Sequence, residues 1–294
     1  MTREDLLNKT AHELVSKGYE SYSCAGTHSC FDIAAKKGQT MLVKVLENID
    51  ALTEEQAQAI KSTASMLKGE SFLVGERARD IKLEDGVIYE RYSVPAGNVA
   101  TFKMVIENEY PIFKKIHKGV AKIDGKMMEK AREKAKLSIA DLAKKTNISR
   151  ETLYRYEKNE ICASRENVEA IEKIVHEKIA TKFDPFEASS HSTPRTFKFI
   201  GIDAIHVKNP FDLFAADKER KNKFIAETKH DVRTLTKRAG MLDKLGEMFD
   251  SRYFIFSRKE KKDNIAGIPV VKQEEIGELK NVKQLIKLVE ERAN

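Results

Sequence analysis

The sequence has no tryptophan, three cysteines and six prolines in 294 residues. Cys24, Cys30 and Cys162 form no CxxC pair and have no histidine cluster nearby, so the sequence supports neither a disulfide framework nor a zinc site. No apolar run approaches the roughly 18 residues of a membrane span. The first residues, MTREDLLNKT, carry charges where a signal peptide would be apolar. We therefore expect a soluble protein in a reducing, cytoplasmic setting, without membrane contact.

Charged residues, by contrast, are abundant in this sequence. Charged residues make up 34% of the chain, and Lys and Arg outnumber Asp and Glu by 53 to 46, which gives a net charge of +7. The excess has the sign expected for a polyanionic partner. High Lys and Glu content without tryptophan is also typical of proteins from hot environments, where it is unrelated to partners. The length predicts two or three domains.

Residues 137–160, LSIADLAKKTNISRETLYRYEKNE, predict two short helices joined by a tight turn. Ser138 and Ser149 are suited to cap the first and second helix, and Asn147 tolerates the left-handed backbone that the turn requires. Apolar residues at helical spacing predict the buried sides of both helices: Ile139, Leu142, Ala143, Leu153 and Tyr156.

This stretch resembles the Cro/Xre-type helix-turn-helix family, whose motif runs LSxxxLAxxxGVSxxxIxxxE with Trp or Tyr before the closing Glu. The matching positions are Leu137, Ser138, Leu142, Ala143, Ile148, Ser149, Leu153, Tyr156 and Glu157. Asn147 and Asn159 replace glycines of the family, and Ile139 replaces a glutamine that binds the DNA backbone in many members. The alternative interpretation is a helical hairpin of no specific function.

The resemblance implies that the second helix reads DNA in the major groove. It begins after Ser149, which we include in the interface. The residues expected to meet base edges are Arg150, Glu151, Thr152 and Arg155. The residues expected to contact phosphates are Lys144, Lys145, Tyr154 and Lys158. Since this motif commonly reads two half-sites, we expect a homodimer.

The motif lies between two units that look like copies of one α/β fold. Four blocks recur in the same order: CFDIAA and PFDLFAA, MLVKV and FIAET, SFLVGER and YFIFSRK, NVATFKMVIE and NVKQLIKLVE. The predicted domains are residues 1–109, 120–180 and 190–294. The segment FDPFEASSHSTP is expected to be the linker before the last domain.

Two local predictions accompany these boundaries. Thr193-Pro194 is a favourable helix start and Gly201 a favourable stop, so a helix is expected between them. Residues 124–136 predict the helix that precedes the motif, with Met127 and Met128 turned inward.

The last unit carries a pattern of chemical interest. Asp212 on one predicted strand and Glu227-Thr228-Lys229 on the next resemble the D…ExK arrangement of the PD-(D/E)xK nuclease superfamily. That chemistry uses two carboxylates to hold Mg2+ and a lysine to stabilise the hydroxide or phosphate. In the first copy Asp32 and Lys44 are present, but Leu42 replaces the second carboxylate. The first copy is therefore expected to be degenerate.

Chance alone also produces such a pattern in a chain this rich in charge. The favoured interpretation is that Asp212, Glu227 and Lys229 are ordinary strand charges or a vestigial site on a non-catalytic scaffold. The fold class is therefore α/β and all-α multidomain, with a four- or five-helix domain between two nuclease-like units. We expect no cofactor and no bound metal.

Over its whole length the order of blocks resembles archaeal proteins described as helix-turn-helix transcriptional regulators. The leading hypothesis is a dimeric, non-catalytic, sequence-specific DNA-binding regulator. One alternative is a factor that binds structured RNA or the ribosome through phosphate geometry. The other is a Mg2+-dependent nuclease that acts through the C-terminal unit.

Overall fold

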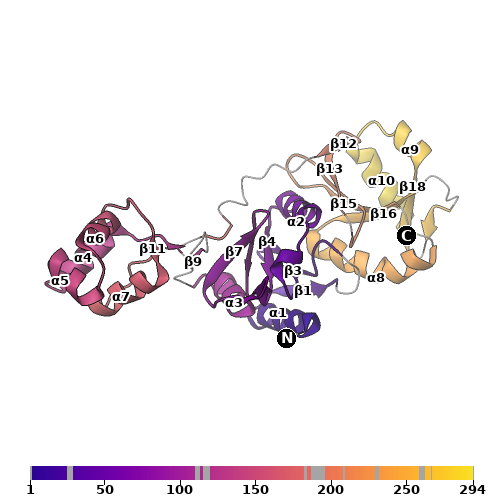
Figure 1. Ribbon diagram of the computed structural model, residues 1–294. Helices are drawn as coiled ribbons and strands as arrows, with labels where there is room; N and C mark the ends of the chain where they lie inside the picture. Colours follow the sequence, from indigo (N-terminus) through magenta and orange to yellow (C-terminus); the bar gives the residue numbers. More distant parts are fainter. Residues whose placement is uncertain are drawn as a thin grey trace.

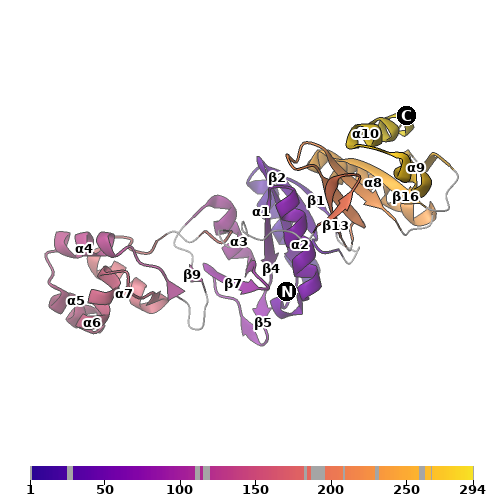
Figure 2. The same cartoon turned by 90° about the horizontal axis from the view of Figure 1, so that it is seen from above.

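The computed structural model describes residues 2–24, 29–109, 113–114, 120–181, 184–186, 196–207, 209–228, 232–257, 262–265 and 267–293. These residues form three units in a row (Figure 1). A small helical domain stands at one end, the N-terminal α/β unit lies in the middle, and the C-terminal α/β unit lies at the other end, as the view from above also shows (Figure 2). The predicted fold class, an all-α domain combined with two α/β units, is confirmed.

The N-terminal unit is a mixed sheet with helices on both faces. It begins with α1 (Arg3–Ser16), which Thr2 caps. The strands of its sheet are β1 (Glu20–Ser23), β2 (Ile33–Lys37), β3 (Gln39–Val45), β4 (Glu70–Val74), β8 (Val94–Gly97) and β7 (Val87–Arg91), in that spatial order. The connecting elements are η1 (Ile49–Ala51), α2 (Glu54–Met66), the small hairpin β5 (Arg77–Ala78) and β6 (Ile81–Lys82), and α3 (Val99–Glu107).

Alternation along the strands produces two apolar layers in this unit. Ile33 and Val43 belong to the layer that α1 and α3 cover, whereas Ala34 and Leu42 belong to the layer on the side of α2. The short tight bend between β2 and β3 is made by Gly38, whose φ of 74° favours glycine.

The C-terminal unit follows the same plan. Its strands are β12 (Phe197–Phe199), β13 (Ile202–His206), β14 (Leu213–Ala216), β15 (Lys223–Glu227), β16 (Arg252–Ser257), β18 (Ile268–Lys272) and β17 (Asn264–Ile265), in spatial order. Its helices are α8 (Val232–Phe249), α9 (Gln273–Glu278) and α10 (Val282–Arg292).

The two sheets share one topology over five strands. In the order β1-β2-β3-β4-β8, two antiparallel pairings are followed by two parallel ones. The order β13-β14-β15-β16-β18 repeats this series. The helix between the third and fourth strand is α2 in one unit and α8 in the other. The four sequence blocks therefore mark equivalent parts of two similar structures.

The two copies pack against each other in a reciprocal way. Helix α2 contacts β13 and β14, and α8 contacts β2. Phe31 and Phe211, each one residue before the strand aspartate of its copy, meet edge to face with ring centres 6.4 Å apart. Phe249 packs on Phe31 at 6.3 Å, and the amide of Cys30 donates to the carbonyl of Asn209 at 3.1 Å. The internal interface is therefore a pseudo-two-fold contact within one chain.

The helical domain, which we call the head, is joined to the N-terminal unit by a narrow neck (Figure 1). Its helices are α4 (Gly125–Lys134), α5 (Ile139–Thr146), α6 (Arg150–Glu157) and α7 (Arg165–Val175). The neck consists of β9 (Phe113–Lys114), β10 (Val120–Ala121) and β11 (Ala163–Ser164), which extend the sheet beyond β7. The entering and leaving chains also pair, since Ile123 and Ala180 form an antiparallel bridge.

Three local predictions need correction. The helix expected at Thr193–Gly201 is wrong, because Phe197–Phe199 is a strand and residues 200 and 201 make the turn into β13, with positive φ angles; residues 193–195 lie outside the described part. Met127 is 45% exposed, while Met128 is buried. In the expected linker, Phe186 packs on Phe72 of the N-terminal core with ring centres 6.4 Å apart.

The internal interface predicts that its aromatic residues stabilise both α/β units. Replacing Phe31 with Ala removes a fully buried ring and should lower the free energy of unfolding by about 3–5 kcal/mol in urea denaturation. Val15→Ala on the exposed side of α1 is the control and should change it by less than about 0.5 kcal/mol. A loss below about 1 kcal/mol for Phe31→Ala would contradict the interface.

Candidate nucleic-acid interface

The turn between α5 and α6 has the geometry that its sequence predicts. Ser138 caps α5 in a capping box with Asp141, and Ser149 caps α6 by accepting from the amide of Thr152 at 3.0 Å. Asn147 lies between them in the left-handed conformation, with φ 58°. Asparagine therefore takes over the role of the usual glycine at this position.

The inward side of α6 fixes how the helix sits on the head. Leu153 and Tyr156 are buried, and Ile148 fills the angle of the turn. The hydroxyl of Tyr156 accepts from Asn167 on α7 at 2.9 Å. Because α6 packs against α4 and α5 and is hydrogen-bonded to α7, it presents a defined outer face.

The outer face carries the residues expected to bind DNA. The exposed ones are Ser149, Arg150, Glu151, Tyr154, Arg155 and Lys158 on or beside α6, and Lys144 and Lys145 at the end of α5. Thr152 is only half-buried and its hydroxyl lies 2.8 Å from that of Ser149. Arg155 lies 3.5 Å from Glu160, and Lys158 lies over the ring of Tyr154. All these contacts lie at the surface, where the side chains remain accessible.

A buried ion pair under α6 was not anticipated from the sequence. Arg132 on α4 donates to both carboxylate oxygens of Glu157, at 2.7 and 3.2 Å, and to the carbonyl of Leu137 at 2.9 Å. The closing glutamate of the motif is thus a structural residue. Gly125 supports the same corner, because a Cβ atom there would lie 2.1 Å from the carbonyl oxygen of Glu157. The signal in the sequence was one arginine on the inward face of a predicted helix.

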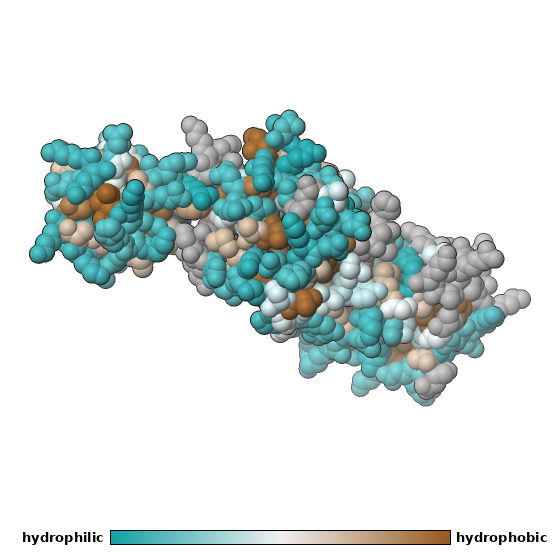
Figure 3. Space-filling view, turned by 90° about the horizontal axis from the view of Figure 1, so that it is seen from below, coloured by the Kyte–Doolittle hydropathy of each residue, from teal (hydrophilic) through white to brown (hydrophobic). Residues whose placement is uncertain are grey.

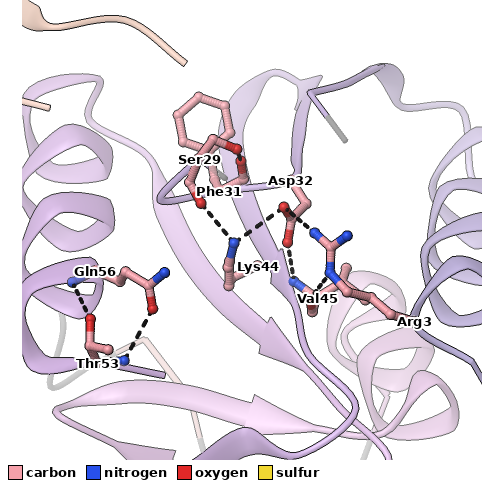
Figure 4. Close-up of polar contacts among 8 residues, drawn as sticks. All are labelled: Arg3, Ser29, Phe31, Asp32, Lys44, Val45, Thr53 and Gln56. Carbon is pink, nitrogen blue, oxygen red and sulfur yellow. Dashed lines mark hydrogen bonds and ion pairs between the residues drawn. The ribbon is translucent and has the colours of Figure 1, made fainter. Parts of the chain in front are cut away.

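At the centre of the N-terminal unit, two basic side chains contact Asp32 (Figure 4). Asp32, which is 1% exposed, accepts from Arg3 at 2.7 Å and from Lys44 at 3.2 Å. Its other oxygen accepts from the amide of Val45 at 2.8 Å. Lys44 also donates to the carbonyl of Ser29 at 2.7 Å. Both oxygens of Asp32 and the ammonium group of Lys44 are therefore bound by other residues of the chain.

The C-terminal copy has a different charge arrangement. The amide of Thr228 donates to Asp212 at 2.7 Å, just as that of Val45 donates to Asp32. Glu227 is therefore the counterpart of Lys44, and Ile225 is the counterpart of Leu42. Arg238 on α8 lies 3.0 Å from Glu227. Lys229 lies outside the described residues.

This correspondence corrects the D…ExK interpretation by two residues. The second carboxylate of a nuclease would stand at Leu42 and Ile225, and both positions are hydrophobic and buried. Glu227 occupies the lysine position, and among the described residues no three of His, Cys, Asp and Glu are grouped as for a metal ion. The residues do not fit a Mg2+ centre of that kind, because the carboxylates that are present already bind cations or amides of the chain.

Comparison with known proteins identifies two of the three units. The family description "PD-(D/E)XK superfamily domain" matches residues 3–111, and "Helix-turn-helix" matches residues 128–179. A protein of Methanothermobacter thermautotrophicus is 34% identical over 99% of this chain and 97% of its own length. It is provisionally named an HTH-type transcriptional regulatory protein. The chain belongs to this family.

Further members come from other archaea and share its full length. A protein of Methanobrevibacter smithii is 31% identical over 99% of this chain and 98% of its own length, and one of Thermococcus gammatolerans is 31% identical over 99% and 97%. Both carry the same provisional name. No solved structure matches the chain significantly. Within the described part, no helix of this family member is long and apolar enough to cross a membrane.

Two of the three thiols are buried beside the Asp32 centre. Cys24 and Cys30 are buried, and burial raises the pKa of Cys30 to about 12. Since the thiolate is the reactive form, neither cysteine has the properties of a redox sensor. Cys162 is exposed on the head.

The environment of Glu227 predicts a pH dependence of stability. Burial, opposed by Arg238 and reinforced by Asp212, raises the pKa of Glu227 from 4.5 to about 8. Between these values the folded state binds more protons than the unfolded one, so the free energy of unfolding should fall as pH rises from about 5 to about 8. Glu227→Gln should remove roughly 1–4 kcal/mol of this fall, measured by urea denaturation at both pH values.

The control for this prediction is Glu278→Gln, which removes an exposed carboxylate at the end of α9. It should leave the pH profile unchanged. If Glu227→Gln and Glu278→Gln gave the same profile as the unchanged protein, Glu227 would titrate normally in the folded state.

Proposed function

We propose that the protein is a sequence-specific, non-catalytic DNA-binding regulator that reads its site with the outer face of α6. The observation that carries this is the combination of a rigidly held α6 with an accessible, mainly basic face on a head that stands apart from the rest of the molecule. Arg150, Glu151, Thr152 and Arg155 would meet base edges in the major groove. Hydrophilic residues cover most of the surface seen in Figure 3, with some apolar residues exposed on the head and on the α/β units.

Register on the duplex would come from the residues around this face. The amide groups at the start of α6, next to Ser149, suit a phosphate oxygen. Lys144 and Lys145 at the end of α5 and Tyr154 and Lys158 on α6 would bind neighbouring phosphates. These contacts carry affinity and orientation, whereas the base contacts carry specificity.

A homodimer would place two heads on two half-sites about one helical turn apart. The equivalent surfaces of the two α/β units bury each other within the chain, at Phe31, Phe211 and Phe249. A second chain would therefore join through other parts of the α/β units or through the head. The homodimer stays a prediction.

The base-reading role of Arg150 is tested by its replacement with Ala. Loss of a bidentate contact to guanine should cost about 1–3 kcal/mol at one base position, measured with a library of single-base variants of a selected DNA site. Lys145→Ala should instead weaken binding to all sequences and lower the salt-dependence slope by about 1. Lys283→Ala, an exposed lysine of α10, is the matched control and should change neither.

Two outcomes would argue against this function. Equal weakening of every sequence by Arg150→Ala would exclude direct readout at that residue. In vitro selection from random DNA and RNA pools that enriched structured RNA and no DNA sequence would favour the RNA-binding alternative, which uses the same basic face.

The non-catalytic role of the α/β units has its own test. We expect no Mg2+-dependent cleavage of plasmid or branched DNA, because hydrophobic residues hold the positions of the second carboxylate. The Glu227→Ala variant should behave identically to the unchanged protein. Cleavage that required both Mg2+ and Glu227 would show that the C-terminal unit is a working nuclease.

A further inference from the structure

A cavity of about 490 Å³ lies where the chain leaving the head returns to the N-terminal unit. Its walls come from the start of β3, the end of α3, Glu70 at the start of β4, and the returning residues 184–186. The volume lies within the range of small-molecule sites. The cavity is separate from both vestigial centres and from the outer face of α6.

One side of the cavity is apolar. Met41, Val105 and Ile106 belong to the buried core of the N-terminal unit, and Phe186 closes over them from the returning chain. Phe186 is held there by the ring of Phe72 and by a hydrogen bond that its backbone amide donates to the carboxylate of Asp184 at 2.8 Å. This side suits an apolar body of a few carbon atoms or one ring.

The other side is anionic. Glu70 and Asp184 both line the cavity, and Gln39 donates to Glu70 at 3.2 Å. Burial, with a contribution from the charge of Asp184, raises the pKa of Glu70 to about 7. Two carboxylates that share a site repel each other, and a cation between them relieves this repulsion.

The positive charge that lines this cavity already has partners within the chain. Lys37 is the cation among the described lining residues, and its ammonium group donates to the carbonyl of Lys17 at 2.7 Å. It also lies over the ring of Tyr19, 5.6 Å from the centre. The cavity therefore offers anionic acceptors beside an apolar wall.

We propose that this cavity is an effector site for a small organic cation, a primary amine on an apolar body. The ammonium group lies between Glu70 and Asp184, and the body packs against Met41, Val105, Ile106 and Phe186. The inference goes beyond DNA recognition, since the site lies on the α/β unit and not on the head.

The position of the cavity links its occupant to the head. Asp184 and Phe186 lie a few residues after the segment by which the chain leaves the head. That segment is joined to the segment that enters the head by a hydrogen bond from the amide of Thr181 to the carbonyl of Lys122, at 2.7 Å. A ligand that contacts residues 184–186 stabilises one placement of this chain. If the ligand binds one conformation of this segment more tightly than another, it shifts the populations of the two conformations. Ligand binding in the cavity is then coupled to the head.

The test uses 2-phenylethylamine as the probe in isothermal titration calorimetry with the full chain and no DNA. The expected Kd is about 1 mM or lower. The isosteric neutral probe, 2-phenylethanol, should bind at least about tenfold more weakly, because it cannot satisfy both carboxylates. Absence of binding up to about 10 mM amine, or equal binding of the alcohol, would overturn the proposal.

Variants locate the binding. Glu70→Gln and Asp184→Asn should each weaken amine binding at least about tenfold, while Glu54→Gln, an exposed carboxylate at the start of α2, should leave it unchanged. Thermal melting of each variant checks that the fold is kept. Unchanged affinity in Glu70→Gln would overturn the site.

The pH profile gives a second readout. Glu70 faces Asp184 and Lys37 in the cavity, and Lys61 and Lys68 line a second hollow on which it also borders. Because the amine binds the carboxylate form, its affinity should rise between about pH 6 and pH 8 in the unchanged protein and stay flat in Glu70→Gln. Identical profiles would contradict the role of Glu70.

The effector role is then measured separately from DNA binding. Saturating amine should change the affinity for a selected DNA site by about fivefold or more. DNA affinity that is unaffected by bound amine would overturn the effector role, and amine binding by a chain without sequence-specific DNA binding would count against the proposed function alone.

Discussion

The packing of one α/β copy against the other is the interaction on which the rest of the structure depends. Each α/β unit has two apolar layers. One is covered by helices of the same unit, and the other includes α2 or α8 and continues into the other unit of the chain. Phe31, Phe211 and Phe249 are each less than 2% exposed, and Phe31 contacts the other two rings across the boundary between the copies. A separated unit would expose these rings to water, at a cost of about 2–3 kcal/mol for each. The duplication is thus a condition of stability for both halves.

The same duplication explains how the centres of the two units became structural. Asp32 is buried and Asp212 is half-buried, and a carboxylate withdrawn from water requires cations or amides as partners. In the first copy Arg3 and Lys44 provide two positive charges for Asp32, and Arg3 ties α1 to the sheet at the same time. In the described part of the second copy, Thr228 supplies the bonds to Asp212, and Arg238 from α8 contacts Glu227 at the lysine position. Each charge that could have bound a metal ion now binds another part of the chain.

The sequence predicted the features that depend on local chemistry. Ser138, Asn147 and Ser149 act within a few residues of themselves, and the periodic apolar residues of the motif placed α5 and α6 correctly. The repeated blocks identified equivalent strands because they include the strand aspartates. What the sequence could not supply are partners far apart in the chain. Arg132 meets Glu157 after 25 residues and Arg3 meets Asp32 after 29.

Two errors have the same origin. The ExK part of the pattern is read along one strand, whereas its register against the aspartate is set by the pairing with the neighbouring strand. The equivalent amides of Val45 and Thr228 reveal that Glu227 stands at the lysine position. Pro194 and Gly201 are favourable for a helix in isolation, but Phe197–Phe199 gains more by pairing with β13 at the edge of the sheet. In both places the neighbouring strand decides the structure, and one sequence read by itself contains no record of which strand lies beside it. For the head the opposite holds, because the contacts that place α6 lie within about 40 residues of it in the chain. The sequence was therefore enough to predict α6 and its outer face. It did not predict how the neck and residues 184–186 fasten the head to the N-terminal unit.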